Sequence, residues 1–164
     1  MVAMSDKDRA IFWKDGIPAE QLVGMAGQTR DLSDVSGGEV RSTDTLFEAD
    51  SDVLVLAAAS YSVDESAVAG IRAPVVVEGA NMAFTEEGRI AADSRSLVIV
   101  PDVIASSSSA AMVCIQMAER GRVPPDLLWN RIEEGIEEAW NTALSRSHSS
   151  GYSPREEHIR MCRT

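Results

Sequence analysis

The sequence VVVEGANMAFTEEG, residues 75–88, joins a run of three valines to a carboxylate, a glycine and an amide. Three consecutive β-branched residues predict a buried strand that ends at Glu78. Thr85 is followed by two glutamates and predicts the start of a helix that runs to about Asp93, because a threonine side chain caps the free N–H groups of a first helical turn. The stretch therefore predicts a buried strand joined to a helix by a polar loop.

Short apolar runs and helical patterns alternate on both sides of this stretch. The run VLVLAAAS, residues 53–60, is continuous, so we expect a strand buried on both faces. Strands that alternate with helices predict an α/β fold with a mostly parallel, Rossmann-like sheet, and right-handed crossovers place helices on both of its faces. The other expected elements are strands at 2–4 and 97–100, helices from Pro18 and at 43–47, 62–71, 106–119 (ending near Gly121) and 126–145, a short helix after Gly151, and a loop over 27–38.

Composition narrows the class of protein. The 164 residues carry a net charge of −11, from 26 acidic and 15 basic residues. This balance argues against a nucleic-acid partner, because phosphate binding needs a basic surface. No apolar run approaches the roughly 20 residues of a membrane span, and the first residues show no export signal, so we expect a cytoplasmic protein. Cys114, Cys162, His148 and His158 lack the spacing of a metal site, and we expect none.

Ligands of a parallel sheet bind beyond the carboxyl ends of its strands, and those ends are rich here in small and polar residues. Asp6 follows the first strand and could accept the two ribose hydroxyls of an adenine nucleotide, or it could cap a turn. The serines at 106–109 could hold an anion at a helix start, or could simply cap that helix. The four expected strand ends are Ser5–Asp6, Ala58–Ser60, Glu78–Asn81 and Pro101–Ser109.

The third of these ends has the most specific chemistry. A carboxylate at the end of an apolar strand is costly without partners, so we expect Glu78 to accept hydrogen bonds from nearby backbone amides. Gly79 allows a close approach of backbone or a positive φ. Asn81 offers a donor and an acceptor, which suits a carboxamide or a ribose hydroxyl. A plain turn would also explain Gly79 and Asn81.

Several of these stretches resemble one family. VVVEGAN (75–81) and LVIVPDVI (97–104) resemble the cofactor domain of the amino-acid dehydrogenases that act on Glu, Leu, Phe and Val. VAMSDKDRAIFWKDGI (2–17) resembles that family's second Rossmann strand and the loop after it, and ADSDVLVLAAAS (49–60) resembles a later strand. The resemblance extends in order over about residues 1–144.

The resemblance implies oxidative deamination of an L-amino acid to a 2-oxo acid, with hydride transfer to NAD or NADP. Asp6 would hold the adenosine ribose, the Ala58 backbone would line the nicotinamide side, and Asn81 would contact the nicotinamide ribose or carboxamide. Ser106 stands where the family usually carries the Asn of an Asn-Ala-Gly-Gly motif. The expected cofactor-binding residues are Asp6, Ala58, Ala59, Glu78, Gly79, Asn81 and Ser106.

The departures from the family pattern predict an incomplete enzyme. The sequence lacks the first strand with its GxGxxG turn, and also the substrate domain with its catalytic lysines and aspartate. Tyr61 replaces an Asn, the serines at 106–109 replace Asn-Ala-Gly-Gly, and Val113 replaces a Ser of glutamate-specific members. We therefore name no catalytic residue, and we expect residues 1–123 to form a partial NAD(P)-binding domain on which helices from 124–164 pack.

Three hypotheses follow for such a chain. It is a subunit whose companion chain supplies the substrate domain or the first strand, a non-catalytic scaffold or interaction protein derived from the domain, or a gene fragment. Because the first strand of the doubly wound order lies at the centre of the sheet, either residues 2–4 shift into its place or another chain fills it. Homo-oligomerisation is a further expectation.

Overall fold

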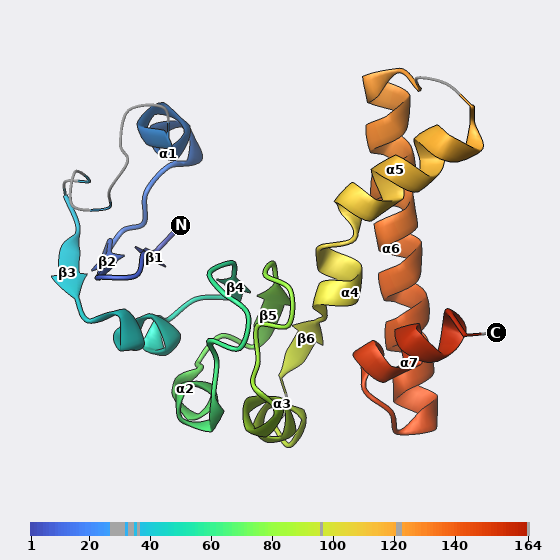
Figure 1. Ribbon diagram of the computed structural model, residues 1–164. Coiled ribbons are helices and arrows are strands. Elements are labelled where there is room, and N and C mark those ends of the chain that lie inside the picture. The colour runs from blue at the N-terminus through green and yellow to red at the C-terminus, as the bar shows by residue number, and fades with distance from the viewer. Residues whose placement is uncertain (27–31, 33–34, 36, 96, 121–122, 164) are drawn as a thin grey trace.

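The computed structural model describes residues 1–26, 32, 35, 37–95, 97–120 and 123–163, and its elements form three groups along the chain (Figure 1). The expected loop at 27–38 and the helix end expected near residue 121 fall mainly outside these residues. The first group contains β1 (Ala3–Ser5), β2 (Ala10–Phe12), α1 (Ala19–Ala26), β3 (Glu39–Arg41) and the 3-10 helix η2 (Thr43–Glu48). The second contains β4 (Val53–Leu56), α2 (Glu65–Gly70), β5 (Val75–Glu78), α3 (Glu86–Asp93) and β6 (Val98–Val100). The third contains α4 (Asp102–Ala105), α5 (Ser108–Ala118), α6 (Pro125–Ser150) and α7 (Pro154–Met161).

The second group is a three-stranded parallel sheet in the order β4-β5-β6, which confirms the predicted α/β class. Val75 lies in register with Val53 on one side and with Val98 on the other. Helices α2 and α3 pack against each other on one face of this sheet (Figure 1). The main hydrophobic core lies between these two layers and is formed by Leu54, Leu56, Val63, Val68, Ile71, Ala73, Val76, Ala83, Phe84, Ala92 and Ile99.

Strand β4 is buried on one face only, so the predicted burial on both faces is wrong. Leu54 and Leu56 point into the core, whereas Val53 and Val55 are 48% and 56% exposed. The strand also ends at Leu56, and residues 57–60 continue as an exposed loop. Because α2 and α3 cover only the face that carries the leucines, the valines remain open to solvent.

The first group forms a second sheet, in the order β1-β2-β3, with antiparallel pairing throughout. The strand predicted at 2–4 is confirmed within one residue, but β2 and β3 were not predicted. Their small core contains Ile11, Trp13, Ile17 and Leu32. Because β1 pairs with β2 and belongs to a different sheet from β4, residues 2–4 do not shift into a place beside β4.

Helix η2 lies between the two sheets and contacts β1, β2 and α2. The amide of Arg72, directly after α2, donates to the carbonyl of Phe47 in η2 (3.1 Å). The Arg72 guanidinium also lies 3.7 Å from the Glu48 carboxylate, and both side chains are exposed. A short helix, predicted at 43–47, thus connects the two sheets.

In the third group the helix expected over 106–119 is present as α5, and a short helix that was not predicted, α4, precedes it. Gly151 ends the long helix α6 with a left-handed φ of 79°, as glycine commonly does. Ser153 and Glu156 form a capping box that starts α7. Helix α7 packs on α6 and β6. Within the described residues, no helix has both the length and the apolar character needed to cross a membrane.

Candidate functional site at the carboxyl ends of the parallel strands

The loops that follow β4 and β5 are bonded to each other. The amide of Tyr61 donates to the carbonyl of Met82 (2.7 Å), and that of Val63 donates to the carbonyl of Ala83 (3.1 Å). The Ser60 hydroxyl donates to the backbone carbonyl of Asn81 (2.6 Å). The parallel pairing of the two strands therefore continues beyond the sheet.

Both loops contain a residue in the left-handed region, which is costly for side chains other than glycine. Tyr61 has a φ of 55° and Met82 a φ of 52°. The Tyr61 hydroxyl contacts the Met82 sulfur (3.2 Å), so the two turns support each other. Backbone strain of this kind persists only where surrounding contacts determine it, and it is enriched at functional sites.

Glu78 closes β5 and is completely buried. Its Oε1 accepts from the Arg89 guanidinium on α3 (2.5 Å), and its Oε2 accepts from the backbone amide of Asp102 (3.3 Å). The expected backbone-amide partner is therefore present, together with an arginine that the sequence did not reveal. Arg89 also lies over the Phe84 ring, 4.5 Å from its centroid. With both oxygens engaged inside the protein, Glu78 fixes the end of β5 from within.

Asp102 is the second buried carboxylate of the site. One of its oxygens accepts from the amide of Met82 (2.8 Å), and the other accepts from the amide of Val103 (2.8 Å) and from the Arg155 guanidinium on α7. Burial lowers the pKa of the Arg155 guanidinium, and the nearby charge of Arg89 lowers it further, whereas Glu78 raises it. Two carboxylates and two arginines thus hold β5, α3, α4 and α7 together beneath the exposed loops.

Ser106 does not start a helix. It is the residue that ends α4, and its hydroxyl donates to the carbonyl of Gly79 (2.8 Å). The next hydroxyl, that of Ser107, donates to the carbonyl of Ile104 (2.7 Å) and makes no cap bond to α5. The serines at 106–109 do lie at the start of a helix, since α5 begins at Ser108, but the expected side-chain cap is absent and Ser106 itself ends α4. Ser106 instead ties α4 to the loop after β5.

Gly79 has neither of the special conformations for which a glycine is required. Gly79 is not one of the described glycines that have a positive φ. A Cβ built on it would lie 3.4 Å from Ala57 Cβ and 3.5 Å from the Leu56 carbonyl oxygen, which are ordinary contacts. The expectation of a positive φ is therefore wrong. Gly79 lies close to β4, but at a distance that would also accommodate a Cβ atom.

The exposed part of the site consists of Asn81 and two alanines. Asn81, Ala58 and Ala59 are all exposed, on adjacent loops at the same edge of the parallel sheet. The backbone of Ala59 is fixed by the Ser62 hydroxyl, which donates to its carbonyl (2.8 Å). This edge therefore presents a carboxamide beside two small side chains, on backbone held by side-chain hydrogen bonds.

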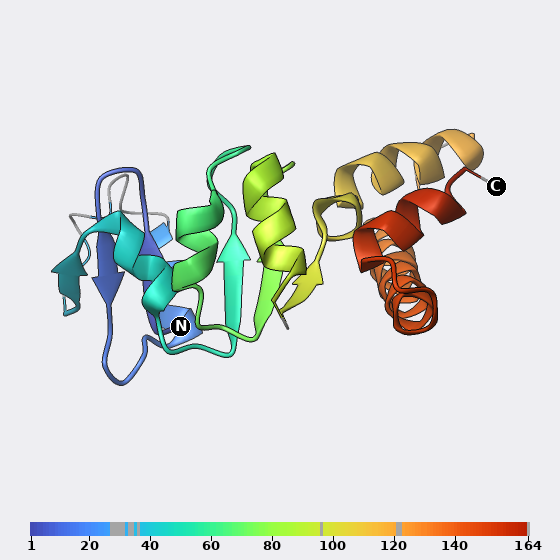
Figure 2. The same cartoon turned by 90° about the horizontal axis from the view of Figure 1, so that it is seen from below.

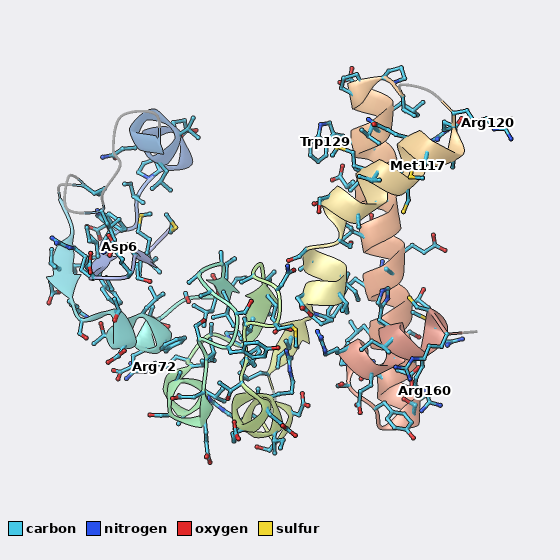
Figure 3. The ribbon with its side chains drawn as sticks, in the orientation of Figure 1. Asp6, Arg72, Met117, Arg120, Trp129 and Arg160 are labelled. Atoms are coloured by element: carbon cyan, nitrogen blue, oxygen red, sulfur yellow. The ribbon has the colours of Figure 1, made fainter. Side chains whose placement is uncertain are left out.

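Asp6 lies in the other sheet, in the turn between β1 and β2 (Figure 3). Its Oδ1 accepts from the amides of Asp8 (2.8 Å) and Arg9 (2.9 Å), which is the turn-capping role that the sequence allowed. Asp6 and Ala58 nevertheless line the same groove, which lies between β1 and β4 and has a volume of about 800 Å³. Asp6 and Ala58 thus lie on opposite sides of this groove, whereas the other predicted residues, which are Ala59, Glu78, Gly79, Asn81 and Ser106, are not among its described lining residues.

These residues are compatible with a nicotinamide cofactor. Asn81 offers hydrogen-bond donors and an acceptor to a carboxamide, and the alanines leave room for a flat ring beside it. Asp6 lines the groove, and a carboxylate can accept ribose hydroxyls.

Comparison with known proteins gives the family. Residues 1–159 match the family model described as Glutamate/Leucine/Phenylalanine/Valine dehydrogenase. The chain therefore belongs to the Glu/Leu/Phe/Val dehydrogenase family, as its sequence resemblance predicted.

Individual relatives carry glutamate dehydrogenase names. The NADP-specific glutamate dehydrogenase A1 of Halobacterium salinarum is 27% identical over 158 residues, which are 94% of this chain and 38% of that protein. The NADP(+)-dependent glutamate dehydrogenase of Pyrobaculum calidifontis is 32% identical over 124 residues, 73% of this chain and 30% of that protein. A cryptic catabolic NAD-specific glutamate dehydrogenase of Bacillus subtilis is 26% identical over 152 residues, 93% of this chain and 34% of that protein.

Solved structures share the fold. The hetero-hexameric glutamate dehydrogenase from Thermus thermophilus, in a Leu-bound form, superimposes with a TM-score of 0.77 at 19% identity over 96% of this chain and 38% of that one. The Plasmodium falciparum glutamate dehydrogenase superimposes with a TM-score of 0.75 at 16% identity, over 96% of this chain and 38% of that one. The chain thus spans between about three and four tenths of the length of these relatives.

Three residues that build the site were not predicted from the sequence. Asp102 gave a partial signal, because it stands in the stretch LVIVPDVI that resembles the family, but Arg89 and Arg155 gave none. Arg155 is 53 positions away from its partner Asp102. Only the folded chain brings such residues together.

Proposed function

We propose that this chain is the NAD(P)-binding part of an amino-acid dehydrogenase, an enzyme that deaminates an L-amino acid oxidatively to a 2-oxo acid. The observation that carries the proposal is the joined pair of loops after β4 and β5, which presents Ala58, Ala59 and Asn81 together at the carboxyl edge. Membership of the family supports it, as do relatives named both NAD-specific and NADP-specific. The relatives therefore support a nicotinamide cofactor of either type.

In this proposal each predicted residue has one of two tasks. Asn81 binds the nicotinamide carboxamide or its ribose, Ala58 and Ala59 line the ring, and Asp6 accepts the hydroxyls of the adenosine ribose. Glu78, Gly79 and Ser106 hold the loop of Asn81 in place through the bonds described above. The bound cofactor would supply the hydride acceptor, and this chain would bind and orient it.

We further propose that the chain is incomplete as a catalyst. Its 164 residues contain no GxGxxG sequence, and their only lysines are Lys7 and Lys14. A companion chain would supply the substrate domain with its catalytic groups, and the assembly would be oligomeric. Residues 1–123 would then form the partial cofactor domain and residues 124–164 the helical segment packed on it.

Titration of the purified protein with NADH and NADPH tests the proposal, with nicotinamide fluorescence and calorimetric heat as readouts. We expect saturable 1:1 binding that Asn81→Ala weakens about tenfold, the effect of losing one or two hydrogen bonds. Asn141→Ala, at an exposed position of α6, is the matched control and should leave affinity unchanged. Absence of binding at millimolar cofactor, or equal affinity of the Asn81 and Asn141 variants, would contradict the assignment.

An exposed apolar surface favours a second candidate function, a non-catalytic scaffold or interaction protein derived from the same domain. No residue of α5 is buried, and Met117 on α5 and Trp129 on α6 are 75% and 60% exposed at the same end of the helical group (Figure 3). Large apolar side chains gathered in this way mark association sites. A chain that binds no cofactor but loses self-association or partner binding on Met117→Glu would support this candidate instead.

A further inference from the structure

A second cavity lies between the parallel sheet and the last two helices, on the side of β6 that faces α7 (Figure 2). It has a volume of about 400 Å³ and is lined by the end of α3, by β6, by the end of α6 and by the start of α7. That volume is in the range of small-molecule sites. Its described lining residues include none of Asp6, Ala58, Ala59 and Asn81, so a ligand bound there would be distinct from the proposed cofactor.

The arginines of this cavity are already bonded to the protein. Arg89 donates to the buried carboxylate of Glu78, and Arg155 donates to the buried carboxylate of Asp102. Arg95 donates to two backbone carbonyls at the end of α2. Because these guanidinium groups have acceptors inside the protein, they leave little attraction for an anion in the cavity.

The carboxylates of the cavity are in a different situation. Among the residues that the structure describes, neither Asp93 on α3 nor Glu156 on α7 forms an ion pair. Partial burial raises the pKa of the Asp93 carboxyl, and of the nearby charges Arg89 lowers this pKa and Glu156 raises it. The two carboxylates therefore lie close enough to repel each other, and a positive charge between them would be attracted by both.

Glu156 has an oxygen available for such a ligand. The capping box of α7 uses its Oε2, which accepts from the amide and the hydroxyl of Ser153 (2.9 and 3.0 Å). A ligand could therefore bond to Oε1 without breaking the cap.

The remaining wall of the cavity is partly apolar. Leu97 and Leu144 are half-buried, and Val98 is exposed, so all three present apolar surface to the cavity. Contact with the methylene groups of a ligand would remove this surface from water, which is favourable. A hydrated metal ion has no apolar part to place there. The described residues also contain no group of three or more metal-binding side chains.

We propose that this cavity binds a small aliphatic amine in its positively charged form. Asp93 and Glu156 accept hydrogen bonds from the ammonium group, and Leu97, Val98 and Leu144 contact the methylene groups. The ligand bridges α3 and α7, so its binding stabilises the packing of α7 on the parallel sheet. This site goes beyond the proposed function and does not depend on it, because no residue that would contact the cofactor takes part.

The test uses the full chain and the probe 1,4-diaminobutane, in a buffer of about 0.15 M NaCl that screens weak attraction to the surface. Calorimetry measures the affinity, and shifts of backbone amide resonances locate the site. We expect saturable 1:1 binding, with shifts concentrated at residues 93–95, 97–99 and 151–156. The uncharged analogue 1,4-butanediol should not bind over the same range of concentration.

Three variants separate the cavity from the general charge of the chain. Asp93→Asn and Glu156→Gln should each lower the affinity about fivefold, the effect of losing one charged partner in a partly exposed site. Glutamine can keep the capping box of α7. Glu87→Gln is the matched control, because it removes the same charge from α3 at an exposed position outside the described lining, and it should leave the affinity unchanged. Circular dichroism should confirm that all three variants are folded.

Three results would overturn the amine site. Equal affinities of the Asp93 and Glu87 variants would mean that the probe responds only to the net charge of −11. Binding of 1,4-butanediol as tight as that of the diamine would mean that the carboxylates play no part. Binding of MgCl2 that depends on Asp93 and Glu156, without binding of the diamine, would make the cavity a metal site.

Discussion

The parallel sheet and the antiparallel sheet differ in the size of their buried cores and in the burial of their ion pairs. The parallel sheet packs eleven buried residues in its core and closes β5 with the buried pair of Glu78 and Arg89. Among the described residues, the core cluster beside the antiparallel sheet has four buried members, and the ion pair between Glu39 and Arg41 is exposed. The residues that would bind nicotinamide therefore lie on a fixed framework, whereas Asp6 lies on a small sheet connected to it through η2. The nicotinamide side of the proposed site is thus supported by the larger core, whereas the position of Asp6 depends on the connection through η2.

The largest expected effect comes from the buried pair. Glu78→Ala leaves the Arg89 guanidinium and the Asp102 amide without their acceptor and should lower the free energy of unfolding by about 3 kcal/mol, the low end for a broken buried pair because Arg89 retains some access to water. Urea unfolding followed by circular dichroism measures it. Glu39→Ala is the control on the other sheet, where an exposed pair contributes little. Equal shifts of the two midpoints would contradict the contrast between the sheets.

The second effect concerns the connection to α7. Asp102→Ala removes the acceptor of two backbone amides and of Arg155, and should cost about 2 kcal/mol. Arg155→Ala should cost less, and the double variant should cost less than the sum, since the two side chains interact. A double-mutant cycle in urea measures this coupling. Strict additivity would mean that the contact between α7 and the strand end contributes nothing to stability.

A smaller and local effect is expected in the antiparallel sheet. Asp6→Ala removes the acceptor of the Asp8 and Arg9 amides and should cost about 1 kcal/mol. Native-state hydrogen exchange should show faster exchange in β1 and β2 with unchanged protection in β4 and β5. Loss of protection in both sheets at once would show that they open as one unit and that the antiparallel sheet is not the less stable of the two.

The smallest effect is a dependence on pH in the third group. Burial lowers the pKa of His158 on α7 below its ordinary value of 6.5, and its Nδ1 is buried with no hydrogen-bond partner among the described residues. The unfolded chain therefore binds this proton more readily than the folded one. The neutral His158 therefore leaves the free energy of unfolding at its full value above about pH 6.5, and that free energy decreases as the pH falls through the lowered pKa of the folded state. His158→Gln should remove this decrease, so the wild type should lose slightly more stability than the variant between pH 7.5 and about pH 5. Parallel pH profiles in thermal unfolding would argue against it.

The sequence predicted well what local patterns determine. The runs at 75–77 and 97–100 are apolar enough to identify β5 and β6, and Thr85 and Gly151 mark helix ends through their own side chain and backbone. It missed β2 and β3, which have three residues each; β2 is apolar but short, and β3 is exposed along its whole length. Such short strands form only because a neighbouring strand supplies their hydrogen bonds.

Two features of the site that the sequence did not predict have the same origin. The serines at 106–109 lie at the start of α5, but the short helix α4 precedes them, so the Ser106 hydroxyl bonds to the carbonyl of Gly79, 27 positions away. The run at 53–60 looks buried on both faces because all its residues are apolar or small, but burial depends on whether a helix covers each face. Neither fact is contained in a local window of sequence.

The sequence by itself determined the α/β class, the positions of most strands and helices, and the family, because hydrophobic period, capping residues and motif spacing are local properties of the chain. It also placed Asp6, Ala58, Ala59 and Asn81 at strand or turn ends. Only the tertiary structure decided that Glu78 is paired with Arg89, that Asp102 is paired with Arg155, and that β1 and β4 stand in separate sheets with a groove between them. These features depend on contacts between residues far apart in the chain, and the energy of a buried charge or an open strand edge is set by what the fold brings beside it.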